Sequence, residues 1–280
     1  MDSHLGKTIR MSRLIRPSTG RGIIVAASHP ILTGPIDAQR TLADVKEVFP
    51  KLRGADAVMT TPGTLPHVLS LYQGRNAPGL VMHMDWMNWY RPFYQAGGRE
   101  AAEGTAVSIA TVEELAQCGV DGLMSYLYLG HEDTRLERDE VERNARLARD
   151  CDRWGLALII EPQPAQGGRD PDARAPEQMA FYARVAAEIG ADIVKSDLPE
   201  GPTLNARIDG FGLVASSCTA PVMLAGGPME NDEQTMQLAA ASVRAGGAGL
   251  VFGRKIYQSP DPAAMITALS DVVHGSPDES

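Results

Sequence analysis

Cysteine is scarce in this chain of 280 residues, which contains three of them and no pair at C-x-x-C spacing. Their odd number and wide separation argue against a disulfide framework and against a site of thiolate metal ligands. The chain also lacks any run of about 18 apolar residues that would span a membrane. Its basic first segment, residues 1–19, has no hydrophobic region behind it as a secretory signal would. These absences predict a cytoplasmic protein with no membrane contact.

An excess of positive charge is also missing. The chain has 26 lysines and arginines against 35 aspartates and glutamates, so its formal net charge is −9. A nucleic-acid surface needs a basic patch, which this balance does not favour. The charge instead suits a protein that handles small metabolites, and at 44% hydrophobic residues the chain can bury a full core.

Short apolar runs alternate with helical patterns along most of the chain. Most of the runs lack apolar/polar alternation, which is typical of parallel strands covered on both faces. Nine runs qualify: 23–27, 57–60, 79–84, 106–109, 122–127, 156–160, 192–196, 221–225 and 249–252. Amphipathic helices are predicted between them, at 41–49, 111–118, 139–154, 176–190, 231–245 and 262–273.

This alternation predicts a single-domain α/β fold, a (β/α)₈ TIM barrel over residues 21–274, with an N-terminal extension at 1–20 and a disordered tail at 275–280. Nine runs are one too many for eight strands, and 106–109 is either a barrel strand or part of a loop. An open doubly wound sheet is the alternative, but no G-x-G-x-x-G follows the first strand. The aromatic insertion 84–104 either packs a neighbouring subunit, covers the active site or caps the barrel.

Two predicted strands near the C-terminal end of the chain end in glycines. Pro221-Val-Met-Leu-Ala-Gly-Gly ends one strand in Gly226 and Gly227, and Gly249-Leu-Val-Phe-Gly-Arg ends the next in Gly253 and Arg254. Barrels commonly build a phosphate site from these last two loops, using backbone N–H groups. We therefore predict a phosphate site here, the alternative being tight turns with a structural ion pair at Arg254.

Lys195 ends the apolar strand in Gly190-Ala-Asp-Ile-Val-Lys, and it is the only one of five lysines in such a place. Burial disfavours the ammonium form, so an amine held there can attack a carbonyl group. The alternative is a lysine that reaches the rim or pairs with a carboxylate such as Asp197 or Glu161. The spacing alone leaves both interpretations open.

Several of these segments resemble the archaeal-type class I fructose-bisphosphate aldolase family, within the DeoC/FbaB aldolase superfamily. The family also includes the autoinducer-2 phosphate thiolases and the aminodideoxyheptulosonate synthases. The resemblance runs over residues 22–274 and is strongest in Ala248-Gly-Leu-Val-Phe-Gly-Arg-Lys-Ile-Tyr. It implies a barrel homo-oligomer without metal or other cofactor, a Schiff-base lysine at Lys195, and phosphate held by the two glycine loops.

The chain departs from that family at two positions. Ser28 stands where the family has an aspartate that assists proton transfer, and Gln163 stands where the sugar aldolases have an acid–base tyrosine. Fructose bisphosphate is therefore not the expected substrate. His29 and Glu161, both at strand ends, are the candidate replacements for proton transfer. Further substrate contacts are predicted at strand ends, at Ser28, Asp85, Gln163 and Tyr128.

The predicted function is a Schiff-base lyase that makes or breaks a C–C bond in a phosphorylated ketose or related carbonyl compound. Lys195, His29 and Glu161 would be its catalytic residues. Three alternatives stay open: a thiolase-like acyl transferase on a phosphorylated diketone, a non-catalytic sugar-phosphate binder, and a metal-dependent barrel enzyme. The last would use His83, Asp85 and Glu161 as ligands.

Overall fold

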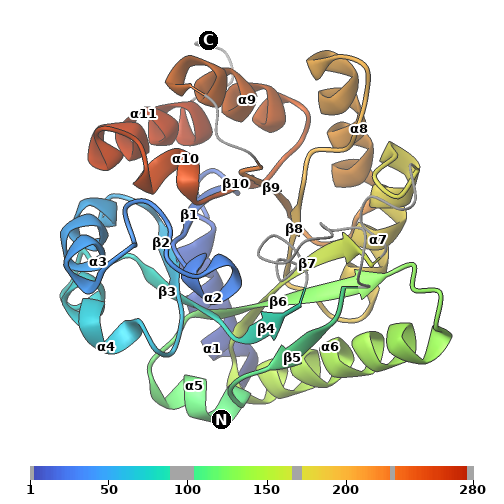
Figure 1. Cartoon of the computed structure of the whole chain (residues 1–280), viewed down its shortest axis with the longest axis horizontal. Coiled ribbons are helices and arrows are strands. Elements are labelled where there is room, and N and C mark those ends of the chain that lie inside the picture. The colour runs from blue at the N-terminus through green and yellow to red at the C-terminus, as the bar shows by residue number, and fades with distance from the viewer. Residues whose placement is uncertain (1–2, 89–103, 166–171, 228–230, 276–280) are drawn as a thin grey trace.

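The computed structural model describes residues 3–88, 104–165, 172–227 and 231–275. Eight parallel strands close into a barrel, with a ring of helices around them (Figure 1). The predicted (β/α)₈ architecture is confirmed. The strands are, in order around the ring, β1 (Gly22–Ala26), β2 (Ala57–Thr60), β3 (Gly79–His83), β6 (Gly122–Leu129), β7 (Ala157–Pro164), β8 (Ile193–Ser196), β9 (Val222–Ala225) and β10 (Gly249–Phe252).

The apolar run 106–109 lies outside the barrel. Strand β5 (Ala106–Ser108) pairs antiparallel with β4 (Asp85–Met87), which follows barrel strand β3 directly. The two form a separate two-stranded sheet. Of the insertion 84–104, residues 89–103 lie outside the described part of the chain, and so does the tail from residue 276.

Some of the helices that surround the barrel begin with a capping box. Thr41 and Thr111 each close a capping box, with Asp44 and Glu114 as the reciprocal partners. The helices and 3₁₀ turns are α2 (Pro30–Thr33), α3 (Leu42–Val48), η1 (Phe49–Leu52), α4 (Leu65–Val68), η2 (Leu69–Tyr72), α5 (Val112–Gln117), α6 (Thr134–Trp154), α7 (Pro176–Glu188), α8 (Leu204–Ser217), α9 (Asp232–Arg244), α10 (Arg254–Tyr257) and α11 (Pro262–His274). Helix α6 begins five residues before the predicted start, and α8 was not predicted from the sequence.

Alternating side chains of the strands separate two layers of core. One set points inward and fills the barrel, for example Ile24, Ile159 and Ile193. The other set packs outward under the helices, for example Val25, Ile160 and Val194. Because successive strand residues face opposite sides, every second residue of β7 and β8 faces the barrel interior. Continuing along these two strands, Glu161 and Lys195 follow on the inward set.

Helix α1 (Ser3–Leu14), part of the predicted N-terminal extension, covers the end of the barrel where the strands begin. Leu14 is fully buried, and it packs on the glycines that start three strands. Added Cβ atoms at Gly79 and Gly122 would lie 3.2 and 3.0 Å from its methyl groups, and one at Gly22 would overlap its carbonyl. The glycines therefore make room for this helix end, and the opposite end of the barrel stays open for the site.

Three aspartates that precede strands connect α1 and the residues after it to the barrel. Asp56, Asp121 and Asp192 each accept a hydrogen bond at 2.8 to 2.9 Å from a backbone N–H of the neighbouring strand. Each also pairs with a basic residue of the N-terminal segment, which are Arg16, Arg13 and Lys7 respectively. The repeated Gly-x-Asp before these strands therefore has a structural role at the closed end. No helix in the described ranges is long and apolar enough to cross a membrane.

Candidate active site

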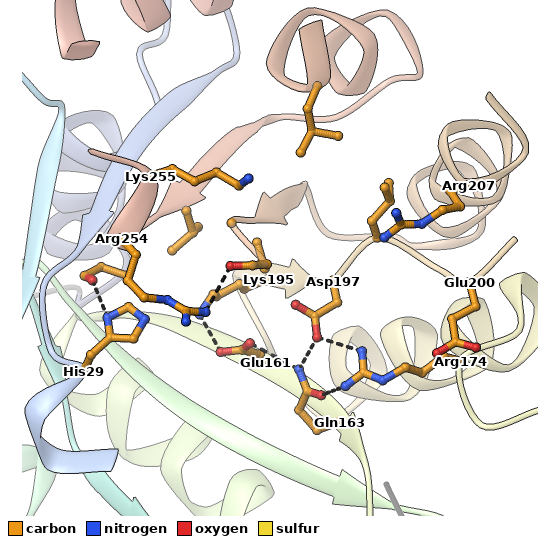
Figure 2. A pocket seen from close by; sticks show the side chains of 18 of the residues that line it. His29, Glu161, Gln163, Arg174, Lys195, Asp197, Glu200, Arg207, Arg254 and Lys255 are labelled. Carbon is orange, nitrogen blue, oxygen red and sulfur yellow. Dashed lines mark hydrogen bonds and ion pairs between the residues drawn. The ribbon is translucent and has the colours of Figure 1, made fainter. Parts of the chain in front are cut away.

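A cavity of about 750 Å³ opens at the carboxyl ends of the barrel strands. Residues from β1, β6, β7, β8, β9 and β10 and the loops that follow them line it (Figure 2). This is the end of the barrel at which barrel enzymes place their active sites. Of the predicted site residues, the cavity lining includes His29, Tyr128, Glu161, Gln163, Lys195, Gly226, Gly227, Gly253 and Arg254.

Lys195 and Glu161 form an ion pair in the cavity wall. The residues lie on neighbouring strands β8 and β7, and Lys195 Nζ is 2.6 Å from Glu161 Oε2. Their side chains are only 10% and 6% exposed. The pair is thus nearly buried, yet both residues also line the cavity. The lysine is therefore not sealed off by its carboxylate, and a substrate in the cavity has access to it.

Burial raises the pKa of the Glu161 carboxyl above its usual value, and the nearby charge of Asp197 acts in the same direction. The Lys195 charge and its hydrogen bond act in the opposite direction. A carboxyl group with a raised pKa is suited to exchange protons near neutral pH. Glu161 can accept the proton that Lys195 must lose before the amine becomes nucleophilic.

A second set of side chains holds Glu161 from the far side. Gln163 Nε2 donates to Glu161 Oε1 at 3.2 Å and to Asp197 Oδ2 at 3.0 Å. Arg174 donates to Gln163 Oε1 at 2.9 Å and to Asp197 Oδ2 at 2.8 Å. Because an arginine can only donate, it sets the orientation of the Gln163 amide and directs the NH₂ group at Glu161.

Although burial opposes its ionisation, Asp197 keeps a pKa below its usual value, because Arg174 pairs with it and both Arg174 and Gln163 donate to it. The sequence offered Asp197 as a partner of Lys195, and its ion pair is with Arg174. We call Gln163, Arg174 and Asp197 the amide clamp. It is visible at the lower right of Figure 2.

His29 lies just after β1, at the N-cap of α2, on the other side of Lys195 (Figure 2). Its Nδ1 is 3.0 Å from the Ala26 carbonyl oxygen, which can only accept, so the neutral ring carries its hydrogen on Nδ1. Burial and the positive charges of Lys195 and Arg254 lower the pKa of His29 to about 3. The resting imidazole is therefore neutral, and Nε2 is left as the acceptor.

The two glycine loops meet beside His29. An added Cβ at Gly253 would collide with the His29 ring and lie 2.5 Å from the Ala26 carbonyl oxygen, so no other residue fits there. Gly227 has a φ of 62°, a conformation that favours glycine. Arg254 donates to the Gly227 carbonyl at 3.1 Å and so connects the two loops. Neither loop carries a side chain at Gly226, Gly227 or Gly253, which leaves the backbone open to an anion.

Ser28 and Asp85 lie apart from the cavity lining. His83 bonds Ser28 Oγ at 3.0 Å through Nδ1 and Asp85 Oδ1 at 3.0 Å through Nε2, and all three residues are buried. Asp85 also accepts from Ser125 and Arg143. This network lies behind the wall that Tyr126 forms, with the His83 and Tyr126 rings 5.5 Å apart.

The three ligands of the metal-dependent alternative are engaged in separate interactions. His83 bonds Asp85, and Glu161 bonds Lys195. In the part of the chain that the structure describes, no group of three histidine, cysteine, aspartate or glutamate side chains is arranged to hold a metal ion.

Residues 23–259 match the DeoC/LacD family aldolase model. This chain belongs to the DeoC/LacD aldolase family. It is 28% identical over 271 residues to the 2-amino-4,5-dihydroxy-6-oxo-7-(phosphonooxy)heptanoate synthase of Streptomyces griseus, covering 96% of this chain and 91% of the relative. It is 26% identical over 275 residues to the 3-hydroxy-5-phosphonooxypentane-2,4-dione thiolase of Photorhabdus laumondii, covering 96% and 82%.

Solved structures agree with the family assignment. An archaeal fructose-1,6-bisphosphate aldolase, with its catalytic lysine covalently bound to the carbinolamine intermediate of the substrate, aligns with a TM-score of 0.76 at 25% identity. The alignment covers 96% of this chain and 100% of that structure. A fructose-bisphosphate aldolase from Slackia heliotrinireducens has the same fold, with a TM-score of 0.79 at 18% identity and coverage of 97% and 85%. The predicted superfamily, fold and aldolase-type enzyme class are confirmed.

Sequence reasoning missed several residues of this family member's cavity, namely Tyr126, Arg174, Arg207 and Lys255. A signal existed for Tyr126, because it is in register with Glu161 and alternates with Tyr128 on the inward face of β6. Arg174 and Arg207 come from a loop and from helix α8, where no periodic pattern marks a cavity-facing side chain. Only the folded chain brings them to the strand ends.

Proposed function

We propose that the protein is a class I aldolase in which Lys195 forms a Schiff base with the ketone of a phosphorylated substrate. The observation that carries the proposal is the nearly buried Lys195–Glu161 pair, 2.6 Å apart, at the wall of an open cavity. The pair supplies an amine and a proton acceptor in contact. The aligned aldolase structure whose lysine carries a carbinolamine supports the same chemistry.

The proton balance follows from this pair. Glu161 accepts a proton from the Lys195 ammonium, and the neutral amine adds to the ketone carbon. One proton then passes from the amine nitrogen to the former carbonyl oxygen, which gives the neutral carbinolamine. Protonated Glu161 returns its proton to the carbinolamine hydroxyl, which leaves as water. The resulting iminium accepts the electron pair of the bond between its α and β carbons as that bond breaks, which leaves an enamine and an aldehyde, and the same steps in reverse form the bond.

A second proton acceptor is needed at the hydroxyl of the carbon that becomes the aldehyde. We assign this role to His29, whose Nδ1 donates to the Ala26 carbonyl and whose Nε2 therefore accepts. The low pKa of His29 in the unliganded site has its origin in burial and in the Lys195 and Arg254 charges. A bound phosphate would offset the Arg254 charge and make the ring more basic when substrate is present.

The glycine loops are the proposed phosphate site. Gly226, Gly227, Gly253 and Arg254 offer backbone N–H groups and a guanidinium next to Lys195. The compounds after which two relatives are named, a 6-oxo-7-(phosphonooxy)heptanoate and a 5-phosphonooxypentane-2,4-dione, each have a ketone on the carbon next to the phosphorylated one. A phosphonooxymethyl ketone would reach from the loops to Lys195, and we propose this substrate class.

Borohydride trapping with dihydroxyacetone phosphate, the simplest hydroxylated phosphonooxymethyl ketone, tests the proposal. We expect a reduced adduct on the Lys195 peptide, located by mass spectrometry. A Lys195→Ala variant should give none, while the matched Lys51→Ala variant, which lacks a surface lysine paired with Glu47, should trap normally. An adduct on another lysine, or no adduct, would reject the Schiff-base assignment and favour a sugar-phosphate binder.

We also propose a cytoplasmic homo-oligomer. Trp86 and Val107 pair across the β4–β5 hairpin and are 39% and 54% exposed, and Ile109 beside them is 44% exposed. Such an exposed apolar face supports self-association. Light scattering of the purified chain tests it, since a monomer at micromolar concentration would contradict the proposal.

A further inference from the structure

We propose that the cavity contains a second anion subsite at Arg207, which takes a carboxylate at the end of the substrate opposite its phosphate. This inference rests on the proposed function and narrows its substrate class to a phosphonooxymethyl ketone with a terminal carboxylate. It starts from the charges of the cavity lining.

The described cavity lining is richer in cations than in anions, although the whole chain carries a net charge of −9. Five basic side chains face three carboxylates. The basic residues are Arg174, Lys195, Arg207, Arg254 and Lys255, and the acidic residues are Glu161, Asp197 and Glu200. A positively charged cavity in a negatively charged protein attracts anionic ligands.

Lys255 is buried and has contacts of its own, and ion pairing separates the other four cations into two groups. Lys195 pairs with Glu161 at 2.6 Å and Arg174 pairs with Asp197 at 2.8 Å, so their charges are matched within the protein. Within the described ranges, Arg207 and Arg254 have no carboxylate at ion-pair distance. Arg254 belongs to the proposed phosphate site, which leaves Arg207 without an assigned counter-ion.

Arg207 is held in place for such a role. Its Nε donates to the Pro199 carbonyl at 3.1 Å, which attaches the side chain to the loop after β8. Gly201 lies against its stem, since an added Cβ there would be 3.2 Å from Arg207 Cγ. The two terminal guanidinium nitrogens have no hydrogen-bond partner among the described residues. They remain available to bind a ligand in the cavity that Arg207 lines.

The two arginines lie on opposite sides of the catalytic lysine. Figure 2 shows Arg254, from α10, on one side of the pocket and Arg207, from α8, on the other, with Lys195 between them. A substrate whose phosphate binds the glycine loops would pass its ketone by Lys195 and bring its far end to Arg207. The site thus has a cation for each end of an extended, doubly charged molecule.

The chemistry at Arg207 favours a carboxylate over a second phosphate. Two terminal nitrogens of one guanidinium match the two oxygens of a carboxylate. The neighbouring lining residues Leu204 and Leu238 are apolar.

Calorimetry on the full chain with three unreactive six-carbon ligands tests the subsite. 6-Phosphogluconate carries a phosphate and a carboxylate, sorbitol 6-phosphate lacks the carboxylate, and mannitol 1,6-bisphosphate has a second phosphate in its place. We expect the first to bind about tenfold more tightly than the second, as one additional charge-assisted contact implies. Equal affinities would overturn the inference, and tighter binding of the bisphosphate would overturn the carboxylate assignment.

Arginine variants test whether Arg207 causes the preference for 6-phosphogluconate over sorbitol 6-phosphate. Arg207→Gln should abolish it and leave the affinity for sorbitol 6-phosphate unchanged, whereas Arg254→Gln should weaken both ligands. Arg184→Gln, an exposed residue that pairs with Glu188 on α7, is the matched control and should bind as the wild type does. A preference that survives in Arg207→Gln overturns the inference. Binding of neither ligand by the wild type rejects the phosphate site as well, while trapping at Lys195 tests the Schiff base separately.

Discussion

The Lys195 ammonium and the Glu161 carboxylate face each other at 2.6 Å across neighbouring strands, at the point where the barrel interior meets the cavity. Burial raises the pKa of the Glu161 carboxyl, and the contact lets one proton pass between the two groups. The hydrogen bonds of the amide clamp hold Glu161 from the other side.

Replacing Glu161 by glutamine keeps the side-chain shape and removes the proton acceptor of Lys195. We expect adduct formation with dihydroxyacetone phosphate to slow by about 10²–10⁴-fold, the range for loss of a general base. Burial raises the pKa of Glu161, so the wild-type rate should increase with pH through a value above the usual carboxyl range of about 4.3. Below that value Glu161 is protonated and cannot accept.

Rapid-quench trapping over a series of pH values measures both effects. In the wild type the rate should fall at low pH, and we call this part of the pH profile the acidic limb. The Glu161→Gln variant should lack it. Glu188→Gln, an exposed α7 carboxylate, controls for the change of charge and should retain the wild-type profile. An acidic limb that persists unchanged in Glu161→Gln would assign it to another group.

Arg174→Met should alter the same limb, although Arg174 has no hydrogen bond to Glu161 or Lys195. Its loss frees the Gln163 amide to rotate and removes the donor that stabilises the Glu161 carboxylate. The acidic limb should move upward by about one pH unit, which corresponds to one hydrogen bond to a charged group. Arg174→Lys keeps the charge beside Asp197 and should restore part of the shift.

A double variant separates positioning from general damage. If Arg174 acts through Gln163, then Gln163→Met with Arg174→Met should move the limb no further than Gln163→Met alone. Additive shifts, or a loss of rate with an unmoved limb, would contradict the role of the amide clamp.

Gly253→Ala should disturb both His29 and the phosphate loop. Its added Cβ would collide with the His29 ring and lie 2.5 Å from the Ala26 carbonyl oxygen. Because that oxygen belongs to the backbone of β1, relieving the contact requires a shift of the strand. We expect a loss of about 1–3 kcal/mol in the free energy of unfolding, as for other overpacked sites. Gly226→Ala is the steric control, because its nearest neighbour would be 3.5 Å away, and it should change stability by less than about 0.5 kcal/mol. Urea denaturation compares the two, and equal losses would refute the steric account.

Leu14→Ala should destabilise the barrel from its closed end. Leu14 is fully buried against strand-starting glycines, so truncation leaves a cavity and should cost about 2–5 kcal/mol. Leu5 lies on the same helix and is 62% exposed, so Leu5→Ala should lower the free energy of unfolding by less than about 0.5 kcal/mol. Thermal and urea unfolding measure both. A Leu14→Ala variant as stable as Leu5→Ala would show that α1 does not support the barrel.

The sequence by itself determined the local features of this protein. Glycine and capping residues such as Thr41 and Thr111 mark helix ends, because their effect depends on neighbours within one turn. Lys195 can be recognised at the end of an apolar strand because burying an ammonium group costs free energy, so lysine is unusual there. The glycine loops at Gly226 and Gly253 can be recognised for the same local reason, since missing side chains expose backbone.

Only the tertiary structure decided which of these features meet. It set residues 106–108 outside the barrel, turned Ser28 and Asp85 into a separate buried network, and placed α1 under the closed end. It also paired Lys195 with Glu161 and brought Arg174 and Arg207 to the same cavity. The physical reason is that strand register and barrel closure are set by contacts between residues far apart in the chain. Local periodicity indicates which side chains share a face of one strand. Only the closure of the barrel determines which residues of other strands and loops each face contacts.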